Sequence, residues 1–146
     1  MKQIAELIEG RPLIHAESSD KVRVVAQKMS DRNIGAVAVL EGGKLVGVFS
    51  ERDLMTRVVA PGLNPDEISV SMVMTKNLVV ADPIEDVSDA VKKMHSLGCR
   101  HLPVVDGGNL LGMISLRDLL EVDGDASRAR ASFLRELVTY SPDYDS

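Results

Sequence analysis

The chain has 146 residues, of which 45% are hydrophobic and 27% are charged, and its formal net charge at pH 7 is −5. This composition is typical of a globular protein that buries a substantial core. The negative net charge disfavours nucleic acid or an anionic membrane surface as the main partner. Aromatic residues make up 3% of the chain and tryptophan is absent, which disfavours the stacking platforms that bind single-stranded nucleic acids.

Cysteine content and hydropathy indicate the cellular compartment. Cys99 is the single cysteine, so no internal disulfide can form. Glu6, Glu9 and Arg11 interrupt the first turns, unlike a secretory leader. No apolar run approaches the ~20 residues that span a bilayer. We therefore expect a cytoplasmic protein without a membrane segment.

The first half of the chain begins with Ile4, Leu7 and Ile8 at helical spacing within residues 2–9. A helix this short is marginal alone, so we expect it to pack on the main body or on a second chain. An extended segment begins at Leu13-Ile14, and Ser18-Ser19-Asp20 offers an N-cap. The pattern then predicts a helix with its apolar stripe over 22–29, a buried strand over 36–40, a glycine turn over 41–44, a return strand over 45–49 and a helix through Leu54, Val58 and Val59.

Residues 61–69 have the composition of a linker, and residues 70–74 predict a short helix before the pattern restarts. The second half repeats the order of the first and ends with a further helix from Ser127 and a loose tail. Its predicted elements are an extended segment over 78–80, a helix that starts at Asp82-Pro83-Ile84-Glu85 and carries an apolar stripe to Leu97, strands over 102–105 and 110–114 around a turn over 106–108, and a helix through 119–120.

One short stretch occurs twice, 65 residues apart: Gly47-Val48-Phe49-Ser50-Glu51-Arg52-Asp53 and Gly112-Met113-Ile114-Ser115-Leu116-Arg117-Asp118. The two halves align around it without a gap, which is strong evidence for duplicated structure. We therefore predict an α+β fold of tandem β-α-β-β-α repeats that cover each other's sheets. The predicted domains are repeat 1 over 11–60 and repeat 2 over 70–123, with a helix over 1–10 and a helix and tail over 124–146, together one module.

The repeated stretch places polar side chains where a strand passes into a helix. Backbone N–H groups are unpaired at a helix start and favour phosphate, an arginine in the same turn could add a charge-assisted bond, and an aspartate could accept both hydroxyls of a ribose. The glycine before each serine would let a ligand approach the strand closely. A capping box, in which the serine and the aspartate bond each other's backbone, is the alternative. The candidate residues are Ser50, Arg52, Asp53, Ser115, Arg117 and Asp118.

The tandem repeat, the segment His101-Leu102-Pro103-Val104-Val105-Asp106, the two Gly-x-x-Ser-x-Arg-Asp-Leu stretches and Met74-Thr75 together resemble a CBS-domain pair, or Bateman module. Stand-alone prokaryotic members are the most similar. The resemblance implies a regulatory module that binds an adenosine-containing ligand (AMP, ADP, ATP, S-adenosylmethionine or NAD) in clefts between the repeats. Occupancy would regulate a partner protein, and two modules would pair into a disk-like homodimer. It also implies that Ser50 and Asp53, and Ser115 and Asp118, contact phosphate and ribose.

The strand opposite the motif differs between the halves, with Arg100-His101-Leu102-Pro103 in the second and Gly35-Ala36-Val37-Ala38 in the first. The family often has a phosphate-contacting basic residue at the position of Arg100, so the two predicted sites are unequal. Residues at the first extended segment of each repeat would pack on the adenine base. The alternative is that they belong to the ordinary hydrophobic core. The resemblance thus adds Arg100, His101, Pro103, Ala36, Ile14, Ala16, Val79 and Ala81 to the candidate nucleotide-binding residues.

Other chemistries find little support in the sequence. No nucleophile with a base, P-loop or dinucleotide fingerprint is present, so we predict no catalytic residues and no enzymatic activity. The three histidines lack metal-ligand spacing with Cys99, so we expect no metal site. Cys99 beside Arg100 could have a lowered pKa, but a buried inert thiol is the simpler interpretation. Two alternatives stay open: a ligand-free interaction dimer that acts through its surface, and an enzyme subunit with weak catalysis on a nucleotide.

Overall fold

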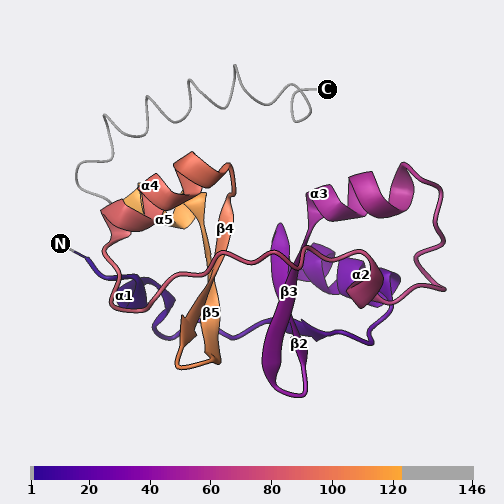
Figure 1. The fold of residues 1–146 in the computed structure, drawn as a ribbon, viewed down its shortest axis with the longest axis horizontal. Helices are drawn as coiled ribbons and strands as arrows, with labels where there is room; N and C mark the ends of the chain where they lie inside the picture. Colours follow the sequence, from indigo (N-terminus) through magenta and orange to yellow (C-terminus); the bar gives the residue numbers. More distant parts are fainter. Residues whose placement is uncertain (1, 123–146) are drawn as a thin grey trace.

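The computed structural model describes residues 2–122, so the helix predicted from Ser127 and the tail over 124–146 lie outside the described residues. Two α+β repeats lie side by side, with their strands facing one another at the centre and their longer helices on the outer sides (Figure 1). The predicted mixed fold of two tandem repeats is confirmed.

The first repeat has a three-stranded sheet in the order β1-β2-β3. β1 runs parallel to β2, and β2 and β3 form an antiparallel hairpin. Continuous burial along β2, from Ala36 to Leu40, explains its uninterrupted apolar sequence. The elements are β1 (His15–Glu17), α2 (Val22–Arg32), β2 (Ala36–Glu41), β3 (Lys44–Ser50), α3 (Glu51–Asp53) and the π-helix η1 (Leu54–Val59).

The second repeat consists of α4 (Val87–Leu97), β4 (His101–Asp106), β5 (Asn109–Ser115) and α5 (Leu116–Val122). The extended segment predicted over 78–80 is not a strand there; one isolated parallel bridge joins Ala81 to Val104. In the first repeat the ladder continues when Ser18 N–H donates to the Leu40 carbonyl at 2.8 Å. The equivalent residue, 65 positions on, is Pro83, which has no N–H to donate.

Each repeat completes its core with a short helix from outside its own β-α-β-β-α unit. α1 (Ile4–Ile8) buries Ile4 and Leu7 in the core of the second repeat, and Ile4 N–H donates to the Glu85 carbonyl at 2.9 Å. The 3-10 helix η2 (Val70–Met72), shorter than the helix predicted over 70–74, contributes Val70 to the core of the first repeat. The helix expected to pack on the main body or a second chain therefore packs on the main body.

The N-cap predicted within 18–20 and the helix start predicted within 82–85 are both wrong, although the first helix does begin at Val22. α2 begins at Val22 without a side-chain cap, because the Asp20 carboxylate accepts instead from Glu17 N–H at 2.9 Å. α4 begins at Val87 rather than within 82–85, because the Asp82 carboxylate accepts from Ile84 N–H at 3.0 Å and closes a turn. Aspartate side chains that bond nearby backbone compete with a helix start in this way.

The helix predicted through Leu54 and Val58 is a π-helix, in which the Ala60 N–H bonds the Met55 carbonyl five residues earlier. Val58 is fully buried, whereas Val59, predicted on the same face, is 66% exposed. Leu97 at the end of α4 is likewise exposed rather than part of the buried stripe. None of the helices within residues 2–122 is long and apolar enough to cross a membrane.

Candidate functional site

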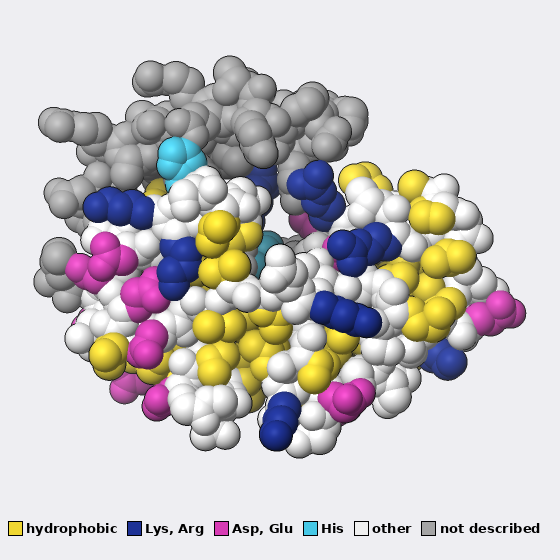
Figure 2. Space-filling view, viewed as in Figure 1, with side chains coloured by type: hydrophobic (Ala, Val, Ile, Leu, Met, Phe, Trp, Pro, Cys, Tyr) yellow, Lys and Arg dark blue, Asp and Glu magenta, His cyan; other side chains and the backbone are white. Residues whose placement is uncertain are grey.

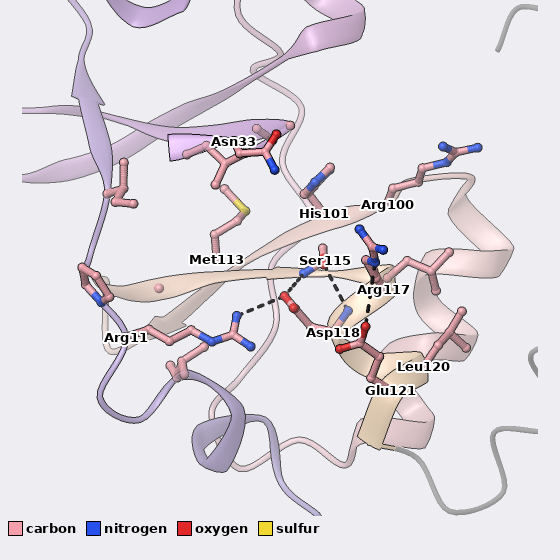
Figure 3. A pocket seen from close by; sticks show the side chains of 18 of the residues that line it. Arg11, Asn33, Arg100, His101, Met113, Ser115, Arg117, Asp118, Leu120 and Glu121 are labelled. Carbon is pink, nitrogen blue, oxygen red and sulfur yellow. Dashed lines mark hydrogen bonds and ion pairs between the residues drawn. The ribbon is translucent and has the colours of Figure 1, made fainter. Parts of the chain in front are cut away.

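A cavity of about 800 Å³ lies between the two repeats, within the size range of small-molecule sites. Its walls come from the end of α2 through the start of β2, from the N-terminus of α3, from the start of β4 and from the strand-to-helix junction of β5 and α5 (Figure 3). The space-filling view shows the surface hollowed between the repeats (Figure 2).

Strand pairing places the two repeated motifs at this centre. His101 lies opposite Ser115 in the β4-β5 hairpin, and Leu116 N–H donates to the Arg100 carbonyl at 2.8 Å. The first repeat has the same arrangement, with Glu51 N–H donating to the Gly35 carbonyl at 2.9 Å. Each strand-to-helix junction is thus held beside the start of its neighbouring strand, and both junctions supply residues to the cavity.

Asp118 lies on the cavity wall with its side chain 26% exposed. It forms a capping pair with Ser115: Ser115 N–H donates to Asp118 Oδ2 at 3.0 Å, and Asp118 N–H donates to Ser115 Oγ at 3.1 Å. Arg11 Nη1 also donates to Oδ2 at 3.0 Å. Burial acts to raise the pKa of Asp118, but the bonds from Arg11 and Ser115 outweigh it and hold the pKa below its ordinary value.

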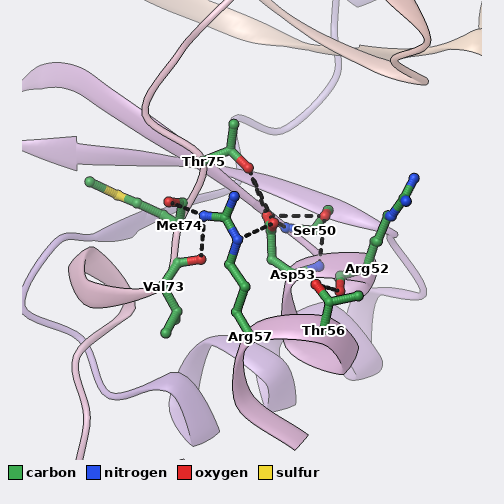
Figure 4. A network of polar contacts seen from close by, with 8 residues as sticks. All are labelled: Ser50, Arg52, Asp53, Thr56, Arg57, Val73, Met74 and Thr75. Atoms are coloured by element: carbon green, nitrogen blue, oxygen red, sulfur yellow. Dashed lines mark hydrogen bonds and ion pairs between the residues drawn. The ribbon is translucent and has the colours of Figure 1, made fainter. Parts of the chain in front are cut away.

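Asp53, the equivalent aspartate of the first repeat, is buried with 7% exposure and does not line the cavity. Ser50 N–H donates to Asp53 Oδ2 at 3.0 Å, and Thr75 Oγ1 donates to Oδ1 at 3.1 Å (Figure 4). Arg57 Nε lies 3.7 Å from Oδ1 and its guanidinium also donates to the Met74 carbonyl at 3.0 Å. The carboxylate of Asp53 therefore joins helix α3 to the segment between the repeats.

The two motif glycines pack against other segments. A Cβ on Gly47 would lie 2.8 Å from Cγ of Met74 and would also meet its sulfur, so the Met74 side chain covers this strand. A Cβ on Gly112 would lie 3.3 Å from Cγ2 of Ile8, although Gly112 itself lines the cavity. The expected close approach of a ligand at Gly47 is therefore wrong, because the space is filled by Met74.

The structure separates the candidate residues into two groups. The candidates that line the cavity are Ile14, Ala36, Arg100, His101, Ser115, Arg117 and Asp118. Ala16 and Ala81 are fully buried in the cores of the first and second repeats, and Val79 packs against the second core. The candidates outside the cavity lining are Ser50, Arg52, Asp53, Ala16, Pro103, Val79 and Ala81.

Four polar residues on the described cavity wall were not predicted: Arg11, Asn33, Glu51 and Glu121. Arg11 is 107 residues from Asp118 in the chain, so no local pattern joins them. The duplication held a signal, because the position 65 residues after Arg11 is Lys76, a second basic residue before a first-strand segment. Glu51 lies inside the repeated stretch but aligns with Leu116, so the alignment did not mark it as polar in both copies.

Burial also changes the acidity of two neighbouring groups. It lowers the pKa of His101, and the charges of Glu51 and Asp118 offset this only in part, so the imidazole is neutral at pH 7. Burial raises the pKa of Cys99, in keeping with an inert thiol rather than one activated by Arg100. Among residues 2–122, the charged side chains that line the cavity are Arg11, Arg100, Arg117, Glu51, Asp118 and Glu121.

The model of the CBS domain matches residues 4–60 and 70–125, one match for each repeat. The chain belongs to the CBS-domain family. The CBS domain-containing protein YhcV of Bacillus subtilis is 37% identical to this CBS pair over 98 residues, which cover 67% of the chain and 69% of YhcV. A protein of Methanopyrus kandleri is 34% identical over 118 residues, which cover 80% of the chain and 60% of that protein's length.

A solved structure extends the comparison to a bound ligand. A CBS-domain protein of Pyrobaculum aerophilum complexed with AMP matches with a TM-score of 0.77 and 26% identity, over 90% of this chain and 99% of that one. The resemblance inferred from the sequence is thus confirmed for the family and the fold, and a similar CBS protein binds an adenosine ligand.

Proposed function

We propose that this CBS pair is a regulatory module that binds one adenosine nucleotide in the cavity beside Asp118 and signals its occupancy to a partner protein. The observation that carries the proposal is the open cavity between the repeats with Asp118 on its wall. The AMP complex of the P. aerophilum protein supports an adenosine ligand. The equivalent position at Asp53 is closed by the protein itself, so we propose one site rather than two.

The lining residues suggest how the nucleotide is held. The Asp118 carboxylate would accept hydrogen bonds from the ribose hydroxyls, either beside its bond from Arg11 or in place of that bond. Arg100 and Arg117 supply positive charge for the phosphate. Ile14 and Ala36 offer apolar surface to the base. Because the wall combines segments of both repeats, a ligand that contacts both would favour one relative arrangement of them, which a partner could detect.

The test is calorimetric titration of the purified protein with AMP, after an absorbance check for carried-over nucleotide. We expect saturable binding that weakens at least ~30-fold in Asp118→Asn, since a bond to a charged acceptor contributes about 2 kcal/mol. Asp89→Asn, on the exposed side of α4 and away from the cavity, is the charge-matched control. Absence of binding to folded, nucleotide-free protein would overturn the proposal.

A ligand-free interaction dimer is the second candidate, and exposed apolar side chains on the first repeat favour it. Val24 on α2 is 54% exposed, Val59 on η1 is 66% exposed and Met72 on η2 is 68% exposed. Contiguous patches of exposed apolar side chains are typical of surfaces that pair, and Figure 2 shows hydrophobic side chains gathered on the first repeat. We propose a homodimer in either case. Sedimentation of the protein with and without AMP distinguishes the candidates: a nucleotide-dependent change in shape supports the sensor, and an unchanged dimer that binds no nucleotide supports the interaction protein.

A further inference from the structure

The two repeats contribute side chains of different charge to the two strand-to-helix junctions on the cavity wall. Arg100 and Leu116 of the second repeat correspond to Gly35 and Glu51 of the first, and the same backbone bond joins each pair. The first repeat thus places a carboxylate where the second has an apolar side chain, and no side chain where the second has a guanidinium. Duplication alone does not explain this difference.

The Glu51 carboxylate faces the second repeat across Gly35. A Cβ built on Gly35 would lie 3.4 Å from Glu51 Oε1 and 3.5 Å from His101 Nε2, so both side chains border the same point. The Glu51 charge acts on His101, where it partly offsets the lowering of the imidazole pKa by burial. Gly35 leaves room for this approach, and Glu51, His101 and Gly35 all line the cavity.

The charges on the described part of the wall balance. Three arginines, Arg11, Arg100 and Arg117, are matched by the carboxylates of Glu51, Asp118 and Glu121. Arg11 bonds Asp118 at 3.0 Å, and Arg117 Nε lies 3.8 Å from Glu121 Oε1. Two of the cations are therefore partly neutralised before a ligand enters. Each phosphate beyond the first brings more negative charge into a space that has no excess positive charge to receive it.

We propose that this cavity selects a nucleoside monophosphate over di- and triphosphates, and that Glu51 of the first repeat is the residue that disfavours the longer phosphate chains. The inference rests on the proposed function, because it concerns the same site. Glu51 repels an added phosphate whichever way the chain runs, since its carboxylate borders the cavity itself. Because dissolved ions screen the repulsion between Glu51 and an added phosphate, this repulsion is strongest at low ionic strength.

The experiment is a calorimetric titration of the full chain with AMP, ADP and ATP in the presence of EDTA, at low and at high salt. For the wild type we expect AMP to bind at least ~10-fold more tightly than ATP at low salt. Glu51→Gln keeps the shape of the side chain, and it should strengthen ATP binding about three- to tenfold while changing AMP binding by about twofold or less. The charge-matched control is Glu67→Gln, at an exposed position outside the cavity lining, which should change neither affinity.

The outcomes separate the inference from the function beneath it. ATP binding as tight as AMP binding in the wild type would overturn the selectivity. An ATP affinity that does not respond to Glu51→Gln in a variant with wild-type thermal stability would overturn the role of Glu51. If none of the three nucleotides binds, the proposed function itself fails and the inference fails with it. The inference is supported if ATP binds more tightly to Glu51→Gln but not to Glu67→Gln, and if this gain in affinity becomes smaller at high salt.

Discussion

The two copies of the Ser-x-Arg-Asp stretch have the same local structure and different surroundings. Asp53 and Asp118 each pair with a serine three residues earlier at a helix start. Asp53 is then enclosed by Thr75 and Arg57, whereas Asp118 borders an open cavity and bonds Arg11 on its edge. The comparison teaches that a duplicated motif can keep its capping role in both copies while only one copy borders an open cavity.

Removing each aspartate should separate the two roles most strongly. Asp53→Ala is expected to lower the free energy of unfolding by ~2–3 kcal/mol, because Thr75 and Arg57 lose a buried charged acceptor. Asp118→Ala should cost ~1 kcal/mol or less beyond the shared loss of the serine cap, because its arginine partner is 43% exposed. Urea unfolding of both variants measures the difference. Equal losses of stability would contradict the distinction between an enclosed Asp53 and an Asp118 that borders the cavity.

The motif glycines provide a second comparison. Gly47→Ala should destabilise the protein by ~1–3 kcal/mol, because its Cβ would overlap Met74, which is buried. Gly112→Ala should cost less than ~1 kcal/mol, because the contact with Ile8 is only slightly tight. Thermal melting of the pair tests this prediction. A lower melting temperature for Gly112→Ala than for Gly47→Ala would contradict it and would show that Met74 adjusts to an added Cβ more easily than Ile8 does.

His101 should make stability depend on pH. Its folded pKa lies below its unfolded value of about 6.5 because of burial, with Glu51 and Asp118 opposing this effect and Arg100 adding to it. The unfolded chain therefore binds a proton first, so the stabilising contribution is present above about pH 6.5 and is lost as pH falls toward the folded pKa. We expect the free energy of unfolding of His101→Gln to depend less on pH below about pH 6.5 than that of the wild type. His95→Gln, on an exposed position of α4, is the control.

Substitution of Arg11 should have the smallest effect on the free energy of unfolding. Its bond helps to hold the pKa of Asp118 below the ordinary value, so that contribution is present above about pH 3.9 and is lost as pH falls through the lower folded pKa. In Arg11→Gln the folded pKa of Asp118 lies closer to the unfolded value, so this contribution becomes smaller and stability above about pH 3.9 falls by at most ~1 kcal/mol. Acid titration followed by circular dichroism measures it. Arg23→Gln, which breaks an exposed pair with Asp66 away from the cavity, should leave the acid transition in place.

Elements whose pattern is local were predicted well. The β2-β3 and β4-β5 hairpins form where apolar runs meet Gly42-Gly43 and Gly107-Gly108, and all four glycines adopt positive φ. The errors also have physical causes: Pro83 cannot donate a ladder bond, Asp20 and Asp82 bond local backbone instead of starting helices, and η1 winds more widely than an α-helix.

The sequence by itself determined the duplication, the hairpins and the membership of the CBS family, because these depend on periodicity and on residues close together in the chain. Only the tertiary structure decided which aspartate borders a cavity. The two motifs share glycine, serine, arginine and aspartate at the same spacing, and the different surroundings of their aspartates come from distant residues, Met74 and Thr75 over one and Arg11 beside the other. Such contacts form when segments far apart in the chain pack together, and no local spacing encodes them.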